Sequence, residues 1–182
     1  KQLLPIYDKP LIYYPLSILM LAGIRDILII VNKGSINQFK KILLNGENLG
    51  IKIRYAEQDV PRGLPDAFKV GKNFIGDKNV ALILGDNFFY GQSLSDKLKR
   101  IVKLKKGASI LVHPVKNPNR FGVATLRKNK IINLVEKPKN TKSNLAITGL
   151  YFFDNSVVRK TLNLRKSKRN ELEIIDLLKE YK

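Results

Sequence analysis

The sequence predicts an α/β fold with a mainly parallel, mixed sheet and flanking helices. Apolar runs of strand length alternate with segments of helical period over the first 107 residues, which is typical of a parallel sheet covered by helices. One run, residues 80–84, is wholly apolar and ends in Gly85, as expected for a parallel strand buried on both faces. From residue 108 onward short strands follow closely, so this half is expected to be mixed or antiparallel.

Composition limits the class of protein. The 182 residues are 44% hydrophobic, enough for one domain with a sizeable core. The chain has no cysteine, which excludes disulfides, thiolate metal sites and a cysteine nucleophile, and is compatible with a reducing compartment. No apolar run approaches the roughly 20 residues of a membrane span. We therefore expect a soluble, cytoplasmic protein that makes no contact with a membrane.

The formal charge of +19 raises the alternative of a basic nucleic-acid-binding domain. The cations are scattered through every segment, and the densest cluster, residues 165–169, contains no aromatic side chain. That distribution favours a solvated surface over a nucleic-acid interface. Excess positive charge also attracts small anions such as nucleotides.

The first half is predicted from start and stop signals. Pro10 suits the first position of a helix that Gly23 ends, although Pro15 should kink that helix or delay its start. Residues 1–10 carry two prolines and are expected to form a loop. Ser93 is expected to cap a helix that Gly107 terminates. Predicted strands cover residues 26–31, 51–55 and 80–84, and predicted helices cover residues 11–21, 36–43, 66–71 and 94–105.

The second half is predicted from short strands and turn signals. Turns are expected at residues 117–119 and 128–130. A last helix over residues 171–181 has an apolar face. The predicted strands cover residues 108–112, 123–126, 131–135 and 146–153.

Three places carry candidate functional residues. Asp86 and Asn87 follow the apolar strand, where open α/β sheets bind ligands; the alternative is ordinary turn formation. Gln58, in a polar loop, is able to pair with the edge of a base, or it is simply a solvated glutamine. Glu136 and Lys137 end a strand with opposite charges that alternation directs to different faces; the alternative is an exposed strand end.

Five motif blocks follow one another along the chain: residues 1–17, Leu84-Gly85-Asp86-Asn87, Arg120-Phe121-Gly122-Val123, Val135-Glu136-Lys137-Pro138-Lys139 and Thr148-Gly149-Leu150-Tyr151-Phe152. With these blocks in this order, the sequence resembles the bacterial glucose-1-phosphate thymidylyltransferases along nearly its whole length. The first block contains Asp8-Lys9-Pro10 and Tyr13-Tyr14-Pro15, and its Tyr-Tyr-Pro resembles the thymidylyl branch. A UTP-using sugar-1-phosphate nucleotidyltransferase remains the nearest alternative.

The resemblance implies a GT-A-like, Rossmann-like nucleotidyltransferase fold that is incomplete at both ends. A Gly-x-Gly-Thr-Arg-Leu loop and the central strand before it would precede Lys1, and a Trp-x-Asp-Thr-Gly block would follow Lys182. It implies one nucleotidyltransferase domain over residues 1–182, an internal fragment with a nucleotide-binding half (1–107) and a sugar-binding half (108–182). We expect the isolated fragment to be inactive and poorly folded, with unpaired strand edges in the middle of its sheet.

The implied reaction converts dTTP and glucose 1-phosphate into dTDP-glucose and pyrophosphate, with Mg²⁺, in dTDP-rhamnose or related deoxysugar and polysaccharide biosynthesis, by a homotetramer. The nucleophile is a phosphate oxygen, mostly ionised at neutral pH because its second pKa is near roughly 6, so no general base is required. The resemblance assigns catalytic roles to Lys1, Asp86 and Lys137, nucleotide binding to Lys1, Gln2, Gln58 and Gly63, metal binding to Asp86, and sugar-phosphate binding to Asn87, Gly122, Glu136, Lys137 and Ile147.

Overall fold

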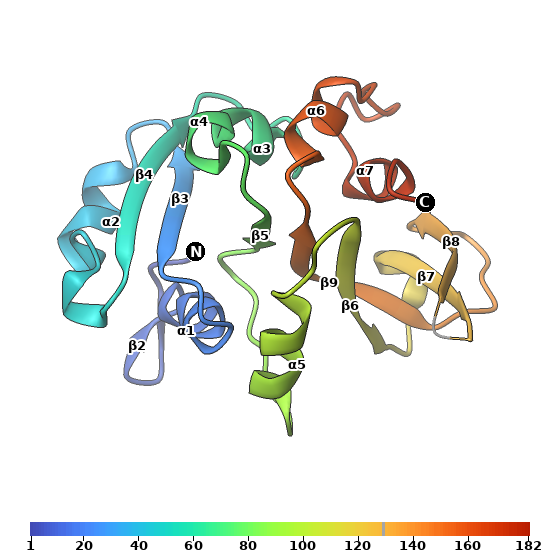
Figure 1. Cartoon of the computed structure of the whole chain (residues 1–182), viewed down its shortest axis with the longest axis horizontal. Coiled ribbons are helices and arrows are strands. Elements are labelled where there is room, and N and C mark those ends of the chain that lie inside the picture. The colour runs from blue at the N-terminus through green and yellow to red at the C-terminus, as the bar shows by residue number, and fades with distance from the viewer. Residues whose placement is uncertain (129) are drawn as a thin grey trace.

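The computed structural model describes residues 1–128 and 130–182 (Figure 1). Asn129, within the predicted turn over residues 128–130, lies outside the described residues. The elements are β1 (Pro5–Ile6), β2 (Lys9–Pro10), α1 (Tyr13–Leu21), β3 (Asp26–Asn32), α2 (Ile36–Leu43), β4 (Lys52–Gln58), α3 (Asp66–Val70), α4 (Lys72–Ile75), β5 (Val80–Ile83), α5 (Leu94–Ile101), β6 (Ala108–Pro114), β7 (Gly122–Arg127), β8 (Lys130–Glu136), β9 (Leu145–Phe153), α6 (Val157–Leu162) and α7 (Ile174–Lys179), with 3₁₀ turns at Glu47–Leu49 and Pro118–Arg120.

The strands form a parallel pair and a larger antiparallel sheet. β3 and β4 are parallel, with Asp26 opposite Lys52 and Asn32 opposite Gln58. β9 is the longest strand and pairs antiparallel with β5, β6 and β7, and β7 continues to β8. Figure 1 shows β9 crossing the middle of the molecule, with α3, α4 and α6 above it and α5 below. A mixed α/β fold with a parallel sheet and flanking helices is confirmed, as is the antiparallel second half.

β5 differs from the prediction of a parallel strand buried on both faces. Among the described residues its partner is the antiparallel β9, and all four of its residues are only half-buried. Its other edge faces β3 across a cavity of about 690 Å³, lined by Ile27 and Ile29 of β3 and by Ala81 and Ile83 of β5. In this part of the chain, therefore, β3 and β5 each have one hydrogen-bonded neighbour and one open edge.

Several predicted boundaries are also corrected. Pro10 pairs with Pro5 in the β1–β2 hairpin instead of starting α1 or lying in a loop. α1 begins at Tyr13, which places Pro15 in the first turn, where a helix needs no N–H donor. Gly23 follows α1 with φ +83°, as a helix stop requires. The left-handed Ser93 makes no side-chain cap hydrogen bond, and α5 ends before residue 105.

Two other differences bear on the site. β4 extends to Gln58, three residues beyond the prediction, because β3 offers a paired partner as far as Asn32. The last helix starts at Ile174 instead of residue 171, since the N–H of Leu172 is donated to the carbonyl of Arg62 at 2.8 Å. That hydrogen bond ties the C-terminal segment to the loop after β4.

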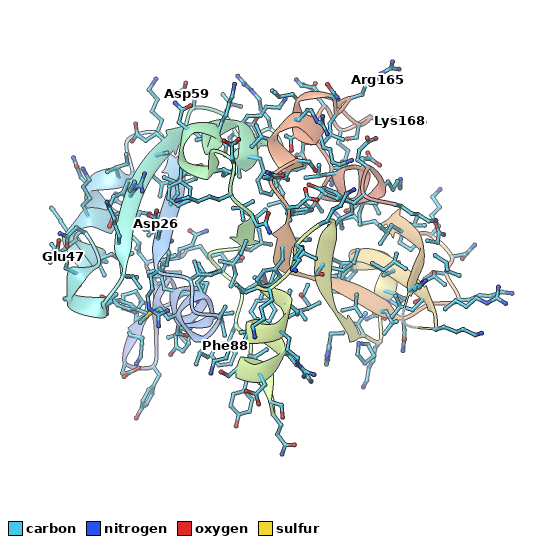
Figure 2. The ribbon with its side chains drawn as sticks, viewed as in Figure 1. Asp26, Glu47, Asp59, Phe88, Arg165 and Lys168 are labelled. Carbon is cyan, nitrogen blue, oxygen red and sulfur yellow. The ribbon has the colours of Figure 1, made fainter. Side chains whose placement is uncertain are left out.

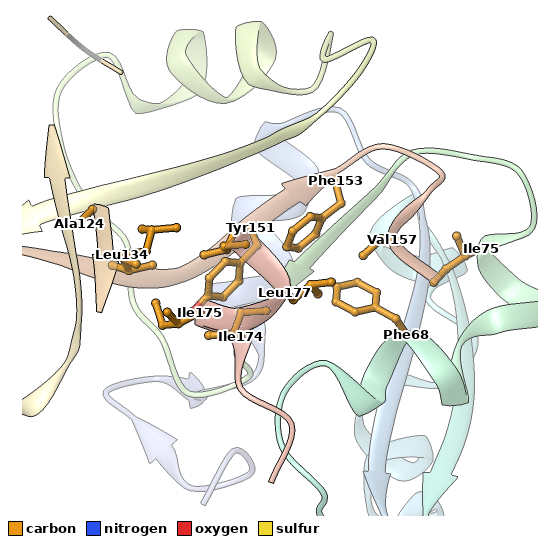
Figure 3. Packing of buried hydrophobic residues seen from close by; sticks show 12 residues of the cluster. Phe68, Ile75, Ala124, Leu134, Tyr151, Phe153, Val157, Ile174, Ile175 and Leu177 are labelled. Carbon is orange, nitrogen blue, oxygen red and sulfur yellow. The ribbon is translucent and has the colours of Figure 1, made fainter. Parts of the chain in front are cut away.

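The largest apolar cluster joins β9 to the surrounding helices (Figure 3). Phe68 of α3 meets Phe153 of β9 edge to face, with ring centroids 5.3 Å apart. Val157 of α6 and Leu177 of α7 are fully buried in the same cluster. The predicted apolar face of the last helix is thereby confirmed, and it holds α7 against the sheet. None of the described helices combines the length and apolar character that a membrane span requires.

Candidate functional site

Lys1, Gln2 and Asp86 meet at the end of β5. Nζ of Lys1 lies 2.7 Å from Oδ2 of Asp86, whose side chain is 32% exposed. The carbonyl of Gln2 accepts a hydrogen bond from the N–H of Ile12 at 2.9 Å. A Cβ added at Gly85 would lie 3.2 Å from Cγ of Gln2, so the side chain of Gln2 rests on the backbone just before Asp86. Residues from two distant parts of the sequence thus form one group.

Asn87 connects this group to β9. A Cβ added at Gly149 would lie 1.9 Å from Nδ2 of Asn87, which shows that the amide rests on the Gly149 backbone. The N–H of Leu84 donates to the carbonyl of Gly149 at 2.9 Å. Ile147, two residues before Gly149 on β9, is 9% exposed and lies opposite Val112 of β6, next to an irregularity in the β6–β9 pairing.

Gly122, Glu136 and Lys137 form a second group at the junction of β7 and β8. Gly122 is opposite Glu136, and Val123 is opposite Ala146, the residue before Ile147. A Cβ at Gly122 would lie 3.3 Å from Oε2 of Glu136, so the carboxylate rests on glycine. The backbone N–H of Lys137 donates to the carbonyl of Phe121 at 3.0 Å. β9 therefore joins the first group to the second.

Glu136 lies in an environment that opposes its charge. Burial, followed by the negative charge of Glu173, raises the pKa of Glu136, while Lys137 and Arg169 counteract the rise. Burial, together with Glu136, raises the pKa of Tyr151 on β9 to about 12. Glu136 is therefore protonated more readily than an exposed glutamate.

Arg169 and Glu173 were not among the predicted site residues. The sequence placed Arg169 in a solvated basic cluster and Glu173 after it. Nε and Nη2 of Arg169 donate to Oε1 of Glu173 at 3.1 and 3.0 Å, and Nη2 also lies 2.9 Å from Oε2. The side chain of Glu173 is 12% exposed. Figure 2 shows Arg165 and Lys168 pointing outward from the same loop. No sequence signal separates Arg169 from these neighbours, because only the docking of α7 brings it toward Glu136.

Gln58 is the last residue of β4 and Gly63 lies in the loop that follows, apart from both groups. Nε2 of Gln58 donates to Oδ2 of Asp66 at 2.7 Å. Gly63 has φ +99°, and a Cβ there would lie 2.0 Å from the carbonyl oxygen of Leu172, so only glycine fits. Within residues 1–128 and 130–182, no hydrogen bond joins either residue to Lys1 or Asp86. Their predicted contact with the base remains a prediction.

Asp86 is the candidate Mg²⁺ ligand of the first group. Asp86 supplies one partly exposed carboxylate, and the described residues hold no group of three or more metal-ligating side chains. Mg²⁺ is commonly held by one or two carboxylates together with substrate phosphates and water, without an all-protein cage. The Lys1 ammonium shows that the carboxylate attracts positive charge. Asp86 therefore fits a cation whose other ligands come from a phosphorylated substrate.

A family model described as nucleotidyl transferase matches residues 1–182. The chain is 52% identical over all 182 residues to glucose-1-phosphate thymidylyltransferase of Neisseria meningitidis serogroup A and 48% identical to that of Mycobacterium tuberculosis H37Rv, and it spans 63% of the length of each. It superposes with a TM-score of 0.90 and 36% identity on a protein assigned as a Bacillus anthracis glucose-1-phosphate thymidylyltransferase in complex with a sucrose, covering 100% of this chain and 73% of that one. A UDP-glucose pyrophosphorylase complexed with UDP-glucose, 24% identical with a TM-score of 0.81 over 99% of this chain and 77% of its own, shares the fold.

Proposed function

Because the chain belongs to the nucleotidyl transferase family, whose model matches all 182 residues, we propose that the whole protein transfers a thymidylyl group from dTTP to glucose 1-phosphate, giving dTDP-glucose and pyrophosphate. The observation that carries the proposal is that Lys1 pairs with Asp86 while Asn87, the next residue, rests on Gly149 of β9. The relatives that support it are glucose-1-phosphate thymidylyltransferases at 48–52% identity.

Charge neutralisation is the main requirement of this reaction. The attacking oxygen belongs to a phosphate that is already ionised near neutral pH, so the site needs no proton acceptor. It must hold two anions together and in line, which positively charged side chains do by position. Lys1 would contact the nucleotide phosphates together with Gln2, and Lys137 would neutralise the sugar phosphate. Asn87, Gly122, Glu136 and Ile147 would line the glucosyl site.

We assign the nucleotide to residues 1–107 and the sugar phosphate to residues 108–182 of a single domain. The grouping of Lys1, Gln2 and Asp86 supports the first half, and the grouping of Gly122, Glu136 and Lys137 supports the second. Asp86 would hold Mg²⁺, which supplies charge neutralisation on the nucleotide phosphates when bound.

The open edges of β3 and β5 support a further part of the proposal. Two strands that face one another across about 690 Å³ without pairing leave backbone groups that a further strand would satisfy. We assign that strand to a part of the whole protein outside residues 1–182. Without it the 182-residue chain would be poorly folded and inactive.

The family relationship supports a proposal for the compartment, the pathway and the assembly of the protein. We assign the protein to the cytoplasm, to deoxysugar biosynthesis of the dTDP-rhamnose type, and to a homotetramer. Three aromatic side chains are exposed, with Tyr7 at 98%, Tyr90 at 92% and Phe88 at 61%. Light scattering of the full-length protein measures the assembly directly.

The experiment measures pyrophosphate release by the full-length protein with Mg²⁺, glucose 1-phosphate and, in turn, dTTP, UTP and CTP. We expect fastest release with dTTP. Fastest release with UTP would replace this proposal by a UTP-using sugar-1-phosphate nucleotidyltransferase. No release with any nucleotide, together with tight and steeply salt-dependent oligonucleotide binding, would favour a nucleic-acid-binding domain.

A further inference from the structure

The amide of Gln58 is oriented by a buried carboxylate. Nε2 of Gln58 donates to Oδ2 of Asp66 at 2.7 Å, and Asp66 is only 5% exposed. The oxygen and nitrogen ends of an amide have nearly the same shape, so its orientation is set by its partner. A carboxylate accepts hydrogen bonds and donates none. The amide nitrogen must therefore face Asp66, and the amide oxygen must face away from it.

The position of Asp66 is itself fixed by the fold. Asp66 begins α3, and its N–H donates to the carbonyl of Gly63 at 3.1 Å. Gly63 is held against Leu172, whose N–H donates to Arg62. The carboxylate thus occupies a rigid turn between the end of β4 and the C-terminal segment.

Three positively charged side chains line the same cavity as this carboxylate. Asp66 lines a cavity of about 330 Å³ together with Arg62, Lys69 and Lys166. Nearby cations offset part of the cost of burying a negative charge. An acidic side chain is therefore tolerated at a place where an amide or an alanine would also fit sterically.

We propose that Asp66 is a positioning residue that makes the base site select pyrimidines carrying an N3–H donor, thymine or uracil, over cytosine. This inference rests on the proposed function and on the contact between Gln58 and the nucleotide base that the family resemblance implies. With Nε2 held by Asp66, Oε1 of Gln58 is the atom left to accept a hydrogen bond. N3 of thymine and of uracil donates one, whereas N3 of cytosine is an acceptor and would face Oε1 with no proton between them.

The test compares nucleotide binding by the full-length protein and its Asp66→Asn variant. Calorimetric affinities for dUTP and dCTP isolate the effect, because these nucleotides differ only at N3 and C4 of the base. The new Asn amide is able to donate to Oε1 of Gln58, which lets the Gln58 amide turn over. We expect the preference for dUTP over dCTP to fall at least about tenfold, the effect of one hydrogen bond of roughly 1.4 kcal/mol.

Two further variants separate positioning from a merely structural role. Asp66→Glu keeps an acceptor and is expected to keep the preference. Asp59→Asn removes the neighbouring but 72% exposed carboxylate and is expected to change nothing. A role limited to the first turn of α3 would change the melting temperature of Asp66→Asn and leave the dUTP to dCTP ratio intact.

An unchanged ratio in a folded Asp66→Asn protein would overturn the inference. If that variant does not fold, Gln58→Leu takes its place, and a preference that survives the loss of the amide overturns the inference equally. Wild-type protein that binds no nucleotide overturns it as well. Wild-type protein that binds with the expected ratios but releases no pyrophosphate contradicts the proposed reaction and leaves the assignment of Asp66 standing.

Discussion

Nζ of Lys1 lies 2.7 Å from Oδ2 of Asp86, although 85 positions separate the two residues in the sequence. The Lys1 side chain is 70% exposed and that of Asp86 32% exposed. An ion pair this exposed contributes only about 0–1 kcal/mol to folding. The pair therefore adds little to the stability of the fold, and the roles proposed for its two charges are tested by activity.

The first prediction concerns these two charges and Lys137. In the full-length protein, Asp86→Asn, Lys1→Met and Lys137→Ala should each lower kcat for pyrophosphate release on the order of 100-fold or more, because charge stabilisation dominates phosphoryl transfer. Melting temperatures should change little. Lys9→Met, which breaks the exposed pair with Asp8, is the control. Near-normal turnover of Asp86→Asn or Lys137→Ala would contradict the assigned roles.

The second prediction tests whether the Asn87 amide must rest on Gly149 of β9. In Gly149→Ala the new methyl group would lie 1.9 Å from Nδ2 of Asn87 and 2.7 Å from Cδ1 of Leu84. The Asn87 amide must move, and we expect kcat/KM for glucose 1-phosphate to fall on the order of 10- to 100-fold. Gly91→Ala adds a methyl group with nothing within 4 Å and should behave as wild type. Equal activity of the two variants would show that Asn87 does not need this position.

The third prediction follows from the raised pKa of Glu136, caused first by burial and then by Glu173. Because the folded protein binds this proton more readily than the unfolded chain, Glu136 lowers stability as pH rises from its ordinary pKa through its raised one. Glu136→Gln should remove that component of the pH dependence in urea unfolding.

The same Glu136→Gln change should raise KM for glucose 1-phosphate roughly tenfold, since a charged hydrogen-bond acceptor is lost, and leave KM for dTTP unchanged. If Glu136→Gln changed only the KM for dTTP, Glu136 would belong to the nucleotide site instead of the sugar-phosphate site.

The fourth prediction concerns the open edges of β3 and β5. Hydrogen exchange followed by mass spectrometry should show these strands exchanging faster in the 182-residue chain than in the full-length protein, because a further strand would protect their backbone N–H groups. The paired β7 and β8 serve as the internal control, and their exchange should differ less between the two proteins than that of β3 and β5. Equal exchange of β3 and β5 in the two proteins would show that no strand fills the cavity between them.

Local sequence patterns determined the elements that local physics controls. The apolar run of residues 27–31 predicted β3, the spacing of Ile36 and Phe39 predicted α2, and Gly23 predicted the end of α1. Hydrophobic period and glycine conformation act over a few residues, so a single sequence carries them. The motifs that resemble the thymidylyltransferases also identified Asp86, Glu136 and Lys137 as candidate site residues from the sequence alone.

Only the tertiary structure decided which strands pair and which side chains meet. The local pattern of residues 80–84 does not predict that β5 pairs antiparallel with β9, because that partner lies about 70 positions later and pairing depends on edges that become available during folding. The same holds for Asn87 on Gly149, Arg169 beside Glu173, and Asp66 beneath Gln58. Hydrogen bonds and ion pairs of this kind join atoms that only the packed fold brings within 3 Å, and the period of a single sequence does not encode such distances.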